Sequence, residues 1–405
     1  MSLSRRTLLG AAAGSVMTTV APGVRVALAA DGGARDIVIS LFLRFGADGL
    51  AMVPPADDGN YVAARPTLRI PTSTALPIGS LDGVPFFMHP EIAELKALYD
   101  QRSLAVVQAV GMRAENRSHF ISQDMMERGQ ADGDAPTSAG WLARHLNASQ
   151  IALAPLGAVA ASGYLDLTLQ GSPRAVAVPD VANFNVFGGE FNLNVISGMQ
   201  EGDETHVAAA RAAVATIRSV QAGLTTLPTQ EGNPAGYTDG PLSTSLRSVA
   251  NLIKMNIGLE VGAVDYFGWD HHVNLNLNFP PQARELSKSL AAFWRDIAAF
   301  RNRVTVVTMT EFGRRVQENS NDGTDHGSAS FMFVLGGAVN GGKIYGVWPG
   351  LRAQDLHAGD LRVTTDYRSV LQEVLVTRRG ETKPQSVFPS VRYSPLGILT
   401  ARGAN

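Results

Sequence analysis

Three short segments in the C-terminal third of the chain combine histidine, carboxylate and glycine. They are Gly-Trp-Asp-His-His at 268–272, Thr-Glu-Phe-Gly-Arg at 310–314 and Gly-Thr-Asp-His-Gly at 323–327. Imidazole and carboxylate bind divalent cations, and the neighbouring glycines allow tight backbone turns. The composition of these segments predicts one metal site that the fold brings together.

Two Asp-His pairs supply the candidate metal ligands. Asp270 and His272 lie two residues apart, and Asp325 directly precedes His326. A single such pair beside Trp269 fits core packing or the support of a ligand at least as well. A second pair of the same kind favours metal binding by all four side chains.

Glu311 follows a hydrophobic stretch and is a candidate further ligand or general base. A salt bridge to Arg314 or Arg315 is the plainer alternative. Arg314 is also a candidate for binding an anionic substrate.

Ser118 and His119 begin a predicted helix, where free N–H groups favour an anion. A Ser118 hydroxyl there could attack phosphorus or sulfur, with His119 as a second catalytic candidate and Arg117 holding the anionic oxygens. The alternative is that Ser118 is only a helix N-cap.

The predicted strands and helices that must position these residues indicate an α/β protein with a mostly parallel sheet and helices on both faces. Apolar runs predict buried strands, and they lie at 37–43, 104–110, 304–309 and 331–335. Apolar periodicity predicts helices at 91–102, 118–128, 204–222, 243–264, 281–300 and 367–376. Arg44 and Asp48 follow the first strand, where ligands bind in open α/β sheets, and are candidate substrate-binding residues.

The domain organisation is predicted to be one α/β domain over residues 31–405, with a less regular insert around 151–242. Within that insert, residues 223–242 are rich in Thr, Pro, Gly and Asn and predict a loop. The loop could be a lid over the site or only a connector.

Residues 1–30 resemble a twin-arginine export signal. Arg5 and Arg6 precede a moderately apolar run, and Ala27-Leu28-Ala29 suits a signal peptidase. The run is too short and too weakly apolar for a membrane span, so the mature form is not expected to cross a membrane. The expected partner is the twin-arginine export machinery, and the expected location is the periplasm or the exterior.

The composition argues against some classes of partner and excludes cysteine-based chemistry. The chain has 405 residues, 45% hydrophobic and 17% charged, with a formal net charge of −2. A mildly acidic chain without basic runs argues against nucleic acid as a partner. The absence of cysteine excludes disulfides, thiolate zinc sites and cysteine nucleophiles.

The sequence resembles a bacterial family, that of domain of unknown function 1501 (DUF1501), over essentially the whole mature chain. The resemblance is carried by the twin-arginine leader and by residues 42–50, 118–120, 268–272, 310–314, 323–327 and 364–368. That family is similar in turn to the superfamily of alkaline phosphatases, sulfatases and phosphoglycerate mutases. The resemblance implies an alkaline-phosphatase-like fold, a Ser or Thr nucleophile and a pair of divalent metals.

Carried onto this chain, the resemblance implies that Asp270, His272 and His326 share one metal. Phe312 stands where the superfamily has a ligand histidine for the second metal, and Arg44 stands roughly where it has an acid. We therefore expect one or two ions, with Asp48 or Asp325 as possible substitutes. Ligands without thiolate favour Zn, Mn or Fe over Ca.

The sequence thus favours an exported metal-dependent hydrolase of phosphate or sulfate esters, acting on a small anionic ester through Ser118 or a metal-activated water. The alternative is a non-catalytic periplasmic binding or assembly protein on the same scaffold, which the replacements at Phe312 and Arg44 favour.

Overall fold

A computed structural model describes residues 35–112, 116–149, 156–173, 175–186, 188–198, 205–227 and 233–401. The predicted export signal therefore lies outside the described residues. Among the described residues, no helix has both the length and the apolar character that crossing a membrane requires.

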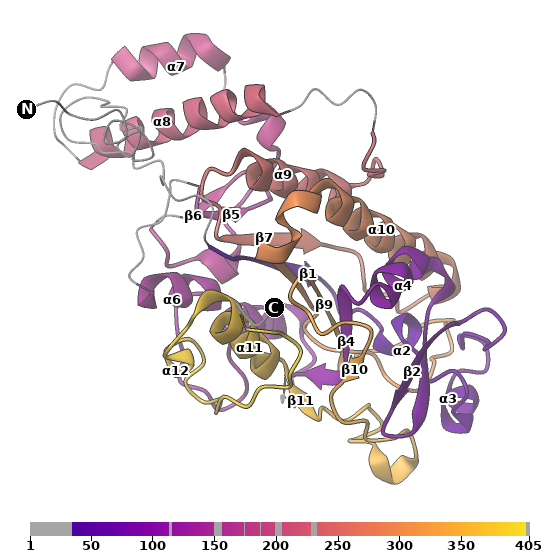
Figure 1. Cartoon of the computed structure of the whole chain (residues 1–405). Helices are drawn as coiled ribbons and strands as arrows, with labels where there is room; N and C mark the ends of the chain where they lie inside the picture. The colour runs from indigo at the N-terminus through magenta and orange to yellow at the C-terminus, as the bar shows by residue number, and fades with distance from the viewer. Residues whose placement is uncertain are drawn as a thin grey trace, which may run out of the picture.

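A central sheet of nine strands organises the molecule (Figure 1). The strands follow the order β10-β4-β9-β8-β1-β7-β5-β6, and β11 also pairs with β4. Their bounds are β1 (Ile37–Leu43), β4 (Leu104–Gly111), β5 (Ala158–Ala160), β6 (Ala175–Ala177), β7 (Val261–Tyr266), β8 (Val304–Met309), β9 (Ser330–Gly336), β10 (Ile344–Tyr345) and β11 (Thr365–Asp366). Only β9 runs antiparallel to its neighbours β4 and β8, so the sheet is mostly parallel as predicted. A separate hairpin joins β2 (Leu76–Leu81) to β3 (Val84–Met88).

Helices cover both faces of this sheet, which confirms the predicted three-layer α/β class. The longer α-helices are α4 (Ala93–Asp100), α5 (His119–Glu127), α6 (Trp141–Ala148), α7 (Gly189–Gly198), α8 (Thr205–Thr226), α9 (Pro241–Met255), α10 (Leu275–Asp296) and α11 (Tyr367–Arg379). Short helical turns are α2 (Gly49–Met52), α3 (Gly59–Ala64), α12 (Pro384–Val387), η1 (Pro90–Ile92), η2 (Leu167–Leu169), η3 (Val181–Asn183), η4 (Ala298–Arg303) and η5 (Ala353–Asp355).

Two hydrophobic cores lie on opposite faces of the sheet. One contains β1 residues Ile37, Ile39 and Leu41 together with side chains of α4, α9 and α10. The other contains Val38 and Phe42 with side chains of α6 and α11. Alternate residues of β1 thus enter different cores, which explains why the strand reads as a continuous apolar run.

The strands predicted from apolar runs are all present, but the predicted helix at 243–264 is wrong in its second half. Helix α9 ends at Met255, where Asn256 takes a left-handed φ of 52°. Residues 261–266 then form β7 between β1 and β5. Asn caps helices in this way because its short polar side chain tolerates left-handed backbone, and the short apolar run at 261–264 fits a buried strand.

Helix α10 begins at Leu275, earlier than the predicted start at Pro281. Its first turn is held by backbone bonds of Asn274 to the carbonyl of Asn321 and of Leu275 to that of Asp322. These are tertiary contacts that local sequence does not reveal. In the region predicted as a loop, α8 extends to Thr226, and residues 228–232 lie outside the described part.

Candidate metal centre

The candidate site lies at the carboxyl edge of the three central parallel strands. The ends of β1, β7 and β8 are level, because Leu43 pairs with Tyr266 and Phe42 with Met309. β7 leads into the segment 268–272 and β8 into 310–314. This is the edge at which open α/β sheets bind ligands.

The segments 310–314 and 323–327 are paired by their backbones. Gly327 N–H donates to the Gly313 carbonyl at 2.8 Å. The backbones of Arg314 and His326 form an isolated antiparallel β-bridge. A Cβ added to Gly313 would lie 1.8 Å from the Ala329 carbonyl oxygen. Glycine is needed there because only a bare backbone fits so close an approach.

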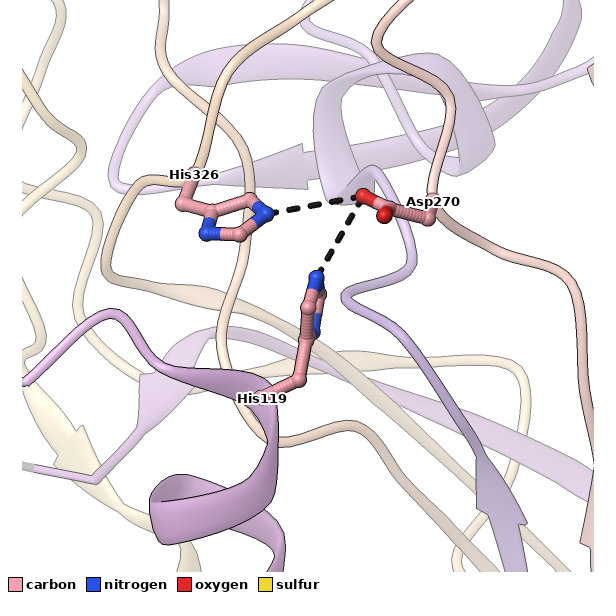
Figure 2. Close-up of side chains that lie close together, drawn as sticks. All are labelled: His119, Asp270 and His326. Carbon is pink, nitrogen blue, oxygen red and sulfur yellow. Dashed lines mark ion pairs between the residues drawn. The ribbon is translucent and has the colours of Figure 1, made fainter.

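One carboxylate oxygen is the centre of the site (Figure 2). Asp270 Oδ1 lies 3.3 Å from His119 Nε2 and 3.5 Å from His326 Nε2. These three donor atoms lie within 4.8 Å of one another, a spacing that suits ligands of one cation. The structure thus brings the predicted Asp270 and His326 together with His119, which the sequence suggested for catalysis.

The remaining ring nitrogens have partners that fix their protons. His119 Nδ1 lies 2.7 Å from Glu311 Oε1, and His326 Nδ1 lies 2.7 Å from the Arg117 carbonyl oxygen. Because both partners are acceptors, each Nδ1 carries a proton, and in the neutral rings Nε2 keeps its lone pair. His119 Nε2 is buried and has no hydrogen-bond partner among the described residues. An orphaned imidazole nitrogen facing a carboxylate is what a resident divalent cation would satisfy, so these residues fit a metal.

His272 lies against two of these three groups. Its Nε2 is 3.1 Å from Asp270 Oδ1 and 2.9 Å from His326 Nε2, while its Nδ1 is 3.1 Å from Asp325 Oδ1. It is not part of the set whose donor atoms all lie close together. Asp325 thus faces His272, in the position of a group that orients a histidine.

The local charges favour an ionised Asp270. Burial opposes ionisation, but the close His119, His326 and Arg314 side chains outweigh it and hold the pKa of Asp270 far below its usual range. For His119, burial opposes protonation, yet the Asp270 and Glu311 carboxylates raise its pKa to about 9. The site therefore has a strong attraction for positive charge.

His271 belongs to the core rather than to this cluster. Its ring is buried against Trp269 and Phe279, and burial lowers its pKa to about 4. Only the neighbouring His272 reaches Asp270, so the two adjacent histidines have different environments.

Phe312 forms an apolar wall of the site. Its ring centroid lies 4.8 Å from that of His119 and 4.8 Å from that of His326. The position that the family resemblance assigned to a ligand histidine is thus occupied by a ring that packs both imidazoles.

Glu311 and Arg314 fix the turn after β1. Glu311 accepts hydrogen bonds from the Phe45 N–H at 2.9 Å and from Gln123 Nε2 at 2.8 Å, besides its contact with His119. Phe45 has a left-handed φ of 80°, a strained conformation for a residue with a Cβ. Arg314 donates to the Phe45 carbonyl and, at 2.7 Å, to Asp270 Oδ1. Its buried guanidinium is therefore committed to holding the site together.

Arg44, a candidate substrate-binding residue, is enclosed by three acidic side chains. Its guanidinium contacts Asp265 at 2.7 Å, Glu127 at 2.8 Å and Asp166 at 3.4 Å, and all four side chains are nearly fully buried. Gln123 accepts from Arg44 while donating to Glu311. Nothing in the local sequence signals Gln123, which links the acid cluster to the candidate metal centre.

Asp48 is likewise engaged in structure. It caps α2 through the Ala51 N–H, pairs with Arg65 at 2.9 Å and accepts from the Thr324 hydroxyl at 3.1 Å. Its hydrogen bond with Thr324 therefore helps to hold the segment 323–327 in place.

Ser118 occupies the N-cap position of α5, but its side chain makes no capping hydrogen bond. The structure thus leaves the hydroxyl of Ser118 uncommitted to the helix. Arg117 pairs with Asp360, and its side chain is about one third exposed.

The comparisons with known proteins agree with the resemblance seen in the sequence. Residues 247–387 match the sequence model of a family described as "Protein of unknown function (DUF1501)". The match confirms the DUF1501 resemblance over the part of the chain that holds Asp270, Glu311 and His326. No curated protein matches the chain.

Solved structures similar to this chain are distant. The C-terminal periplasmic domain of EptC from Escherichia coli shares 9% identity, with 90% of this chain and 89% of that one covered and a TM-score of 0.37. The alkaline phosphatase of the Antarctic bacterium TAB5 shares 13% identity over 77% of this chain and 95% of that one, with a TM-score of 0.29. The lipoteichoic acid synthase LtaP from Listeria monocytogenes shares 10% identity over 82% and 76%, with a TM-score of 0.33.

Proposed function

We propose that the protein is a metal-dependent hydrolase of phosphate or sulfate esters. One observation carries the proposal, namely the convergence of His119 Nε2, Asp270 Oδ1 and His326 Nε2 at the carboxyl edge of the sheet. His119, Asp270 and His326 would hold the ion, with His272 beside them. Zn, Mn or Fe suits this donor set. When bound, such an ion supplies a Lewis acid that stabilises negative charge on an ester oxygen.

The chain itself would supply the nucleophile and the anion contacts. The Ser118 hydroxyl, adjacent to His119 and free of a capping role, or a water molecule would attack phosphorus or sulfur as the bond to the alcohol oxygen breaks. Arg117, with its partly exposed side chain, would contact an anionic oxygen of the substrate.

A second candidate is a binding or assembly protein without catalysis. It is favoured by Glu311, whose carboxylate is buried and occupied by the Phe45 N–H, Gln123 and His119. A carboxylate so fully bonded is poorly placed to act as a general base.

Metal analysis and an ester screen together separate the two candidates. We expect the purified protein to hold a divalent metal and to hydrolyse aryl phosphates or sulfates, with activity lost on adding a chelator. Asp270→Ala should lose both metal and activity, whereas Asp100→Ala, on the exposed face of α4, should keep both. Stoichiometric metal without turnover of any ester would establish the binding protein instead.

Export to the periplasm or the exterior, through the twin-arginine machinery, is part of the proposal. It is supported by the paired Arg5 and Arg6 before an apolar run. Replacing both arginines by lysine should retain the protein in the cytoplasm in a fractionation experiment, and unchanged export would refute this route.

A further inference from the structure

Large hydrophobic side chains are exposed around the candidate metal centre. Nine such side chains are exposed in the described part of the chain, and six of them flank the site in sequence or are bonded to the strand that leads to it. These six, which we call the apolar rim, are Phe120, Ile121, Tyr164, Phe267, Val273 and Leu277. Exposure ranges from 48% for Phe267 to 78% for Phe120.

Phe267 of the apolar rim is connected to the candidate metal centre through Phe45. The Phe45 ring lies 5.2 Å from the His119 ring and 6.1 Å from the Phe267 ring, measured between centroids. Phe312 extends the same apolar surface behind His119. An aromatic surface therefore runs from a candidate metal ligand outward to solvent.

This surface is held in place. Gln282 of α10 donates to the Phe267 carbonyl at 2.8 Å, and the Arg44 guanidinium lies 5.7 Å from the Phe267 ring centroid. Tyr164 is fixed by its hydroxyl, which donates to Asp265. Apolar groups that a fold holds rigidly in water beside a polar site are typical of a ligand-binding surface.

The chemistry around the rim favours a small soluble ligand over a membrane surface. Leu277 is flanked by Asn276 and Asn278, and Val273 by His272 and Asn274. These neighbours are polar and without the cluster of lysines or arginines that binds anionic lipids. The occupant that fits is the apolar part of a molecule whose anionic part reaches the metal centre.

We propose that the site takes water-soluble esters whose alcohol carries an aromatic group, with the ring lying against Phe45 and Phe267. This inference rests on the proposed function, because it assigns the alcohol side of the ester that the metal centre would cleave. It selects aryl esters over esters of polar alcohols such as glycerol.

The first test compares two substrates on two variants. For 2-naphthyl phosphate or sulfate, Phe267→Ser should lower kcat/KM by about tenfold, since it removes apolar area from contact with the ring. For the corresponding glycerol ester, Phe267→Ser should match the unmodified protein. Phe191→Ser, which changes a more exposed phenylalanine on the distant helix α7, should change the rate for neither substrate (Figure 1). Equal losses for both esters, or no loss for the naphthyl ester, would overturn the inference.

The second test separates this inference from the proposed hydrolysis. Metal-loaded protein is titrated with naphthyl phosphonate and with methyl phosphonate, neither of which can be hydrolysed at oxygen. Tighter binding of the naphthyl compound that is lost in Phe267→Ser supports the rim even when no ester is turned over. Equal binding of the two phosphonates, or Phe267-dependent binding to phosphatidylcholine vesicles alone, refutes it.

Discussion

At the scale of single residues, the geometry of the site depends on the groups that accept a hydrogen bond from Nδ1 of each histidine. Glu311 and the Arg117 carbonyl hold the Nδ1 protons of His119 and His326, which leaves both Nε2 atoms facing Asp270. The sequence pointed to the Asp-His pairs because the same pattern occurs twice, and to Glu311 because it follows a buried strand. It did not reveal that His119 joins Asp270, since the pairing spans elements that only the tertiary structure brings together.

Glu311→Gln is expected to weaken metal binding by about 10- to 100-fold, because an amide no longer offers His119 a strong, unambiguous acceptor. Asp325→Asn is the matched control. The Asp325 side chain is 57% exposed, so its hold on His272 is screened by water and its loss should cost less. Competition titration against a chromophoric chelator measures both affinities, and a larger loss in Asp325→Asn would contradict the assignment.

At the scale of elements, the turn after β1 is closely packed against the site. Gly46 has a φ of 70°, and a Cβ there would lie 2.9 Å from Phe312. The strand before it was predictable from its apolar run. The turn's conformation was not, because it is imposed by Glu311 and Arg314 from more than 260 residues away.

Gly46→Ala should lower the free energy of unfolding by about 1–3 kcal/mol, because the new side chain meets both backbone strain and Phe312. Gly59→Ala provides the control, since nothing lies within 4 Å of a Cβ at that position in the first turn of α3. The control should be neutral or slightly stabilising. Urea unfolding of the two variants decides the point, and equal stabilities would show that the turn is compliant.

His89, near the junction of α4 and α10, should make the stability of the fold depend on pH. Its Nδ1 accepts from the Glu91 N–H, its ring packs against Phe279, and burial lowers its pKa to about 4. A folded-state pKa below the unfolded value of about 6.5 means that stability is complete above pH 6.5 and decreases as the pH falls toward 4.

We therefore expect His89→Gln to flatten the loss of stability between pH 6.5 and 4, by at most about 3 kcal/mol. Thermal unfolding across that range, compared with His357→Gln at an exposed position, provides the measurement. An unchanged pH profile in His89→Gln would show that other groups cause the acid sensitivity.

At the scale of the whole molecule, two hydrophobic cores lie on either face of the central sheet. Buried charged side chains gather in a few clusters beside them. One is the cluster of Arg44 with Glu127, Asp166 and Asp265. Burial raises the pKa of Glu127 and of Asp166 despite the neighbouring guanidinium. Arg44 is thus a fixed internal cation, and among the described residues the group at His119, Asp270 and His326 is the one open cluster suited to a metal ion.

Arg44→Ala should destabilise the fold by about 3–5 kcal/mol at neutral pH, because it leaves three buried carboxylates without a cation. The deficit should shrink toward pH 5, since protonation relieves carboxylates whose folded-state pKa is raised. Arg284→Ala, which breaks an exposed pair with Glu91, should be nearly neutral at both pH values. A deficit independent of pH would argue for lost packing rather than unbalanced charge.

The class of fold was predictable from sequence because buried strands and amphipathic helices leave strong periodic signals. β7 was missed because its apolar run continued the pattern of α9 past Asn256, and this strand is the one that delivers Asp270. The acid partners of Arg44 were unpredictable for a related reason. Glu127, Asp166 and Asp265 come from three elements whose meeting depends on strand order.

The distances along the chain between the site's parts have a consequence for how the protein matures. His119 and Glu311, which share a hydrogen bond, are 192 residues apart in sequence, and Asp270 comes from a strand that pairs with β1. During synthesis, His119 leaves the ribosome long before Asp270 and His326 exist. A cation held by the candidate metal centre would therefore bind only after the central strands have assembled, so its uptake would follow folding rather than guide it.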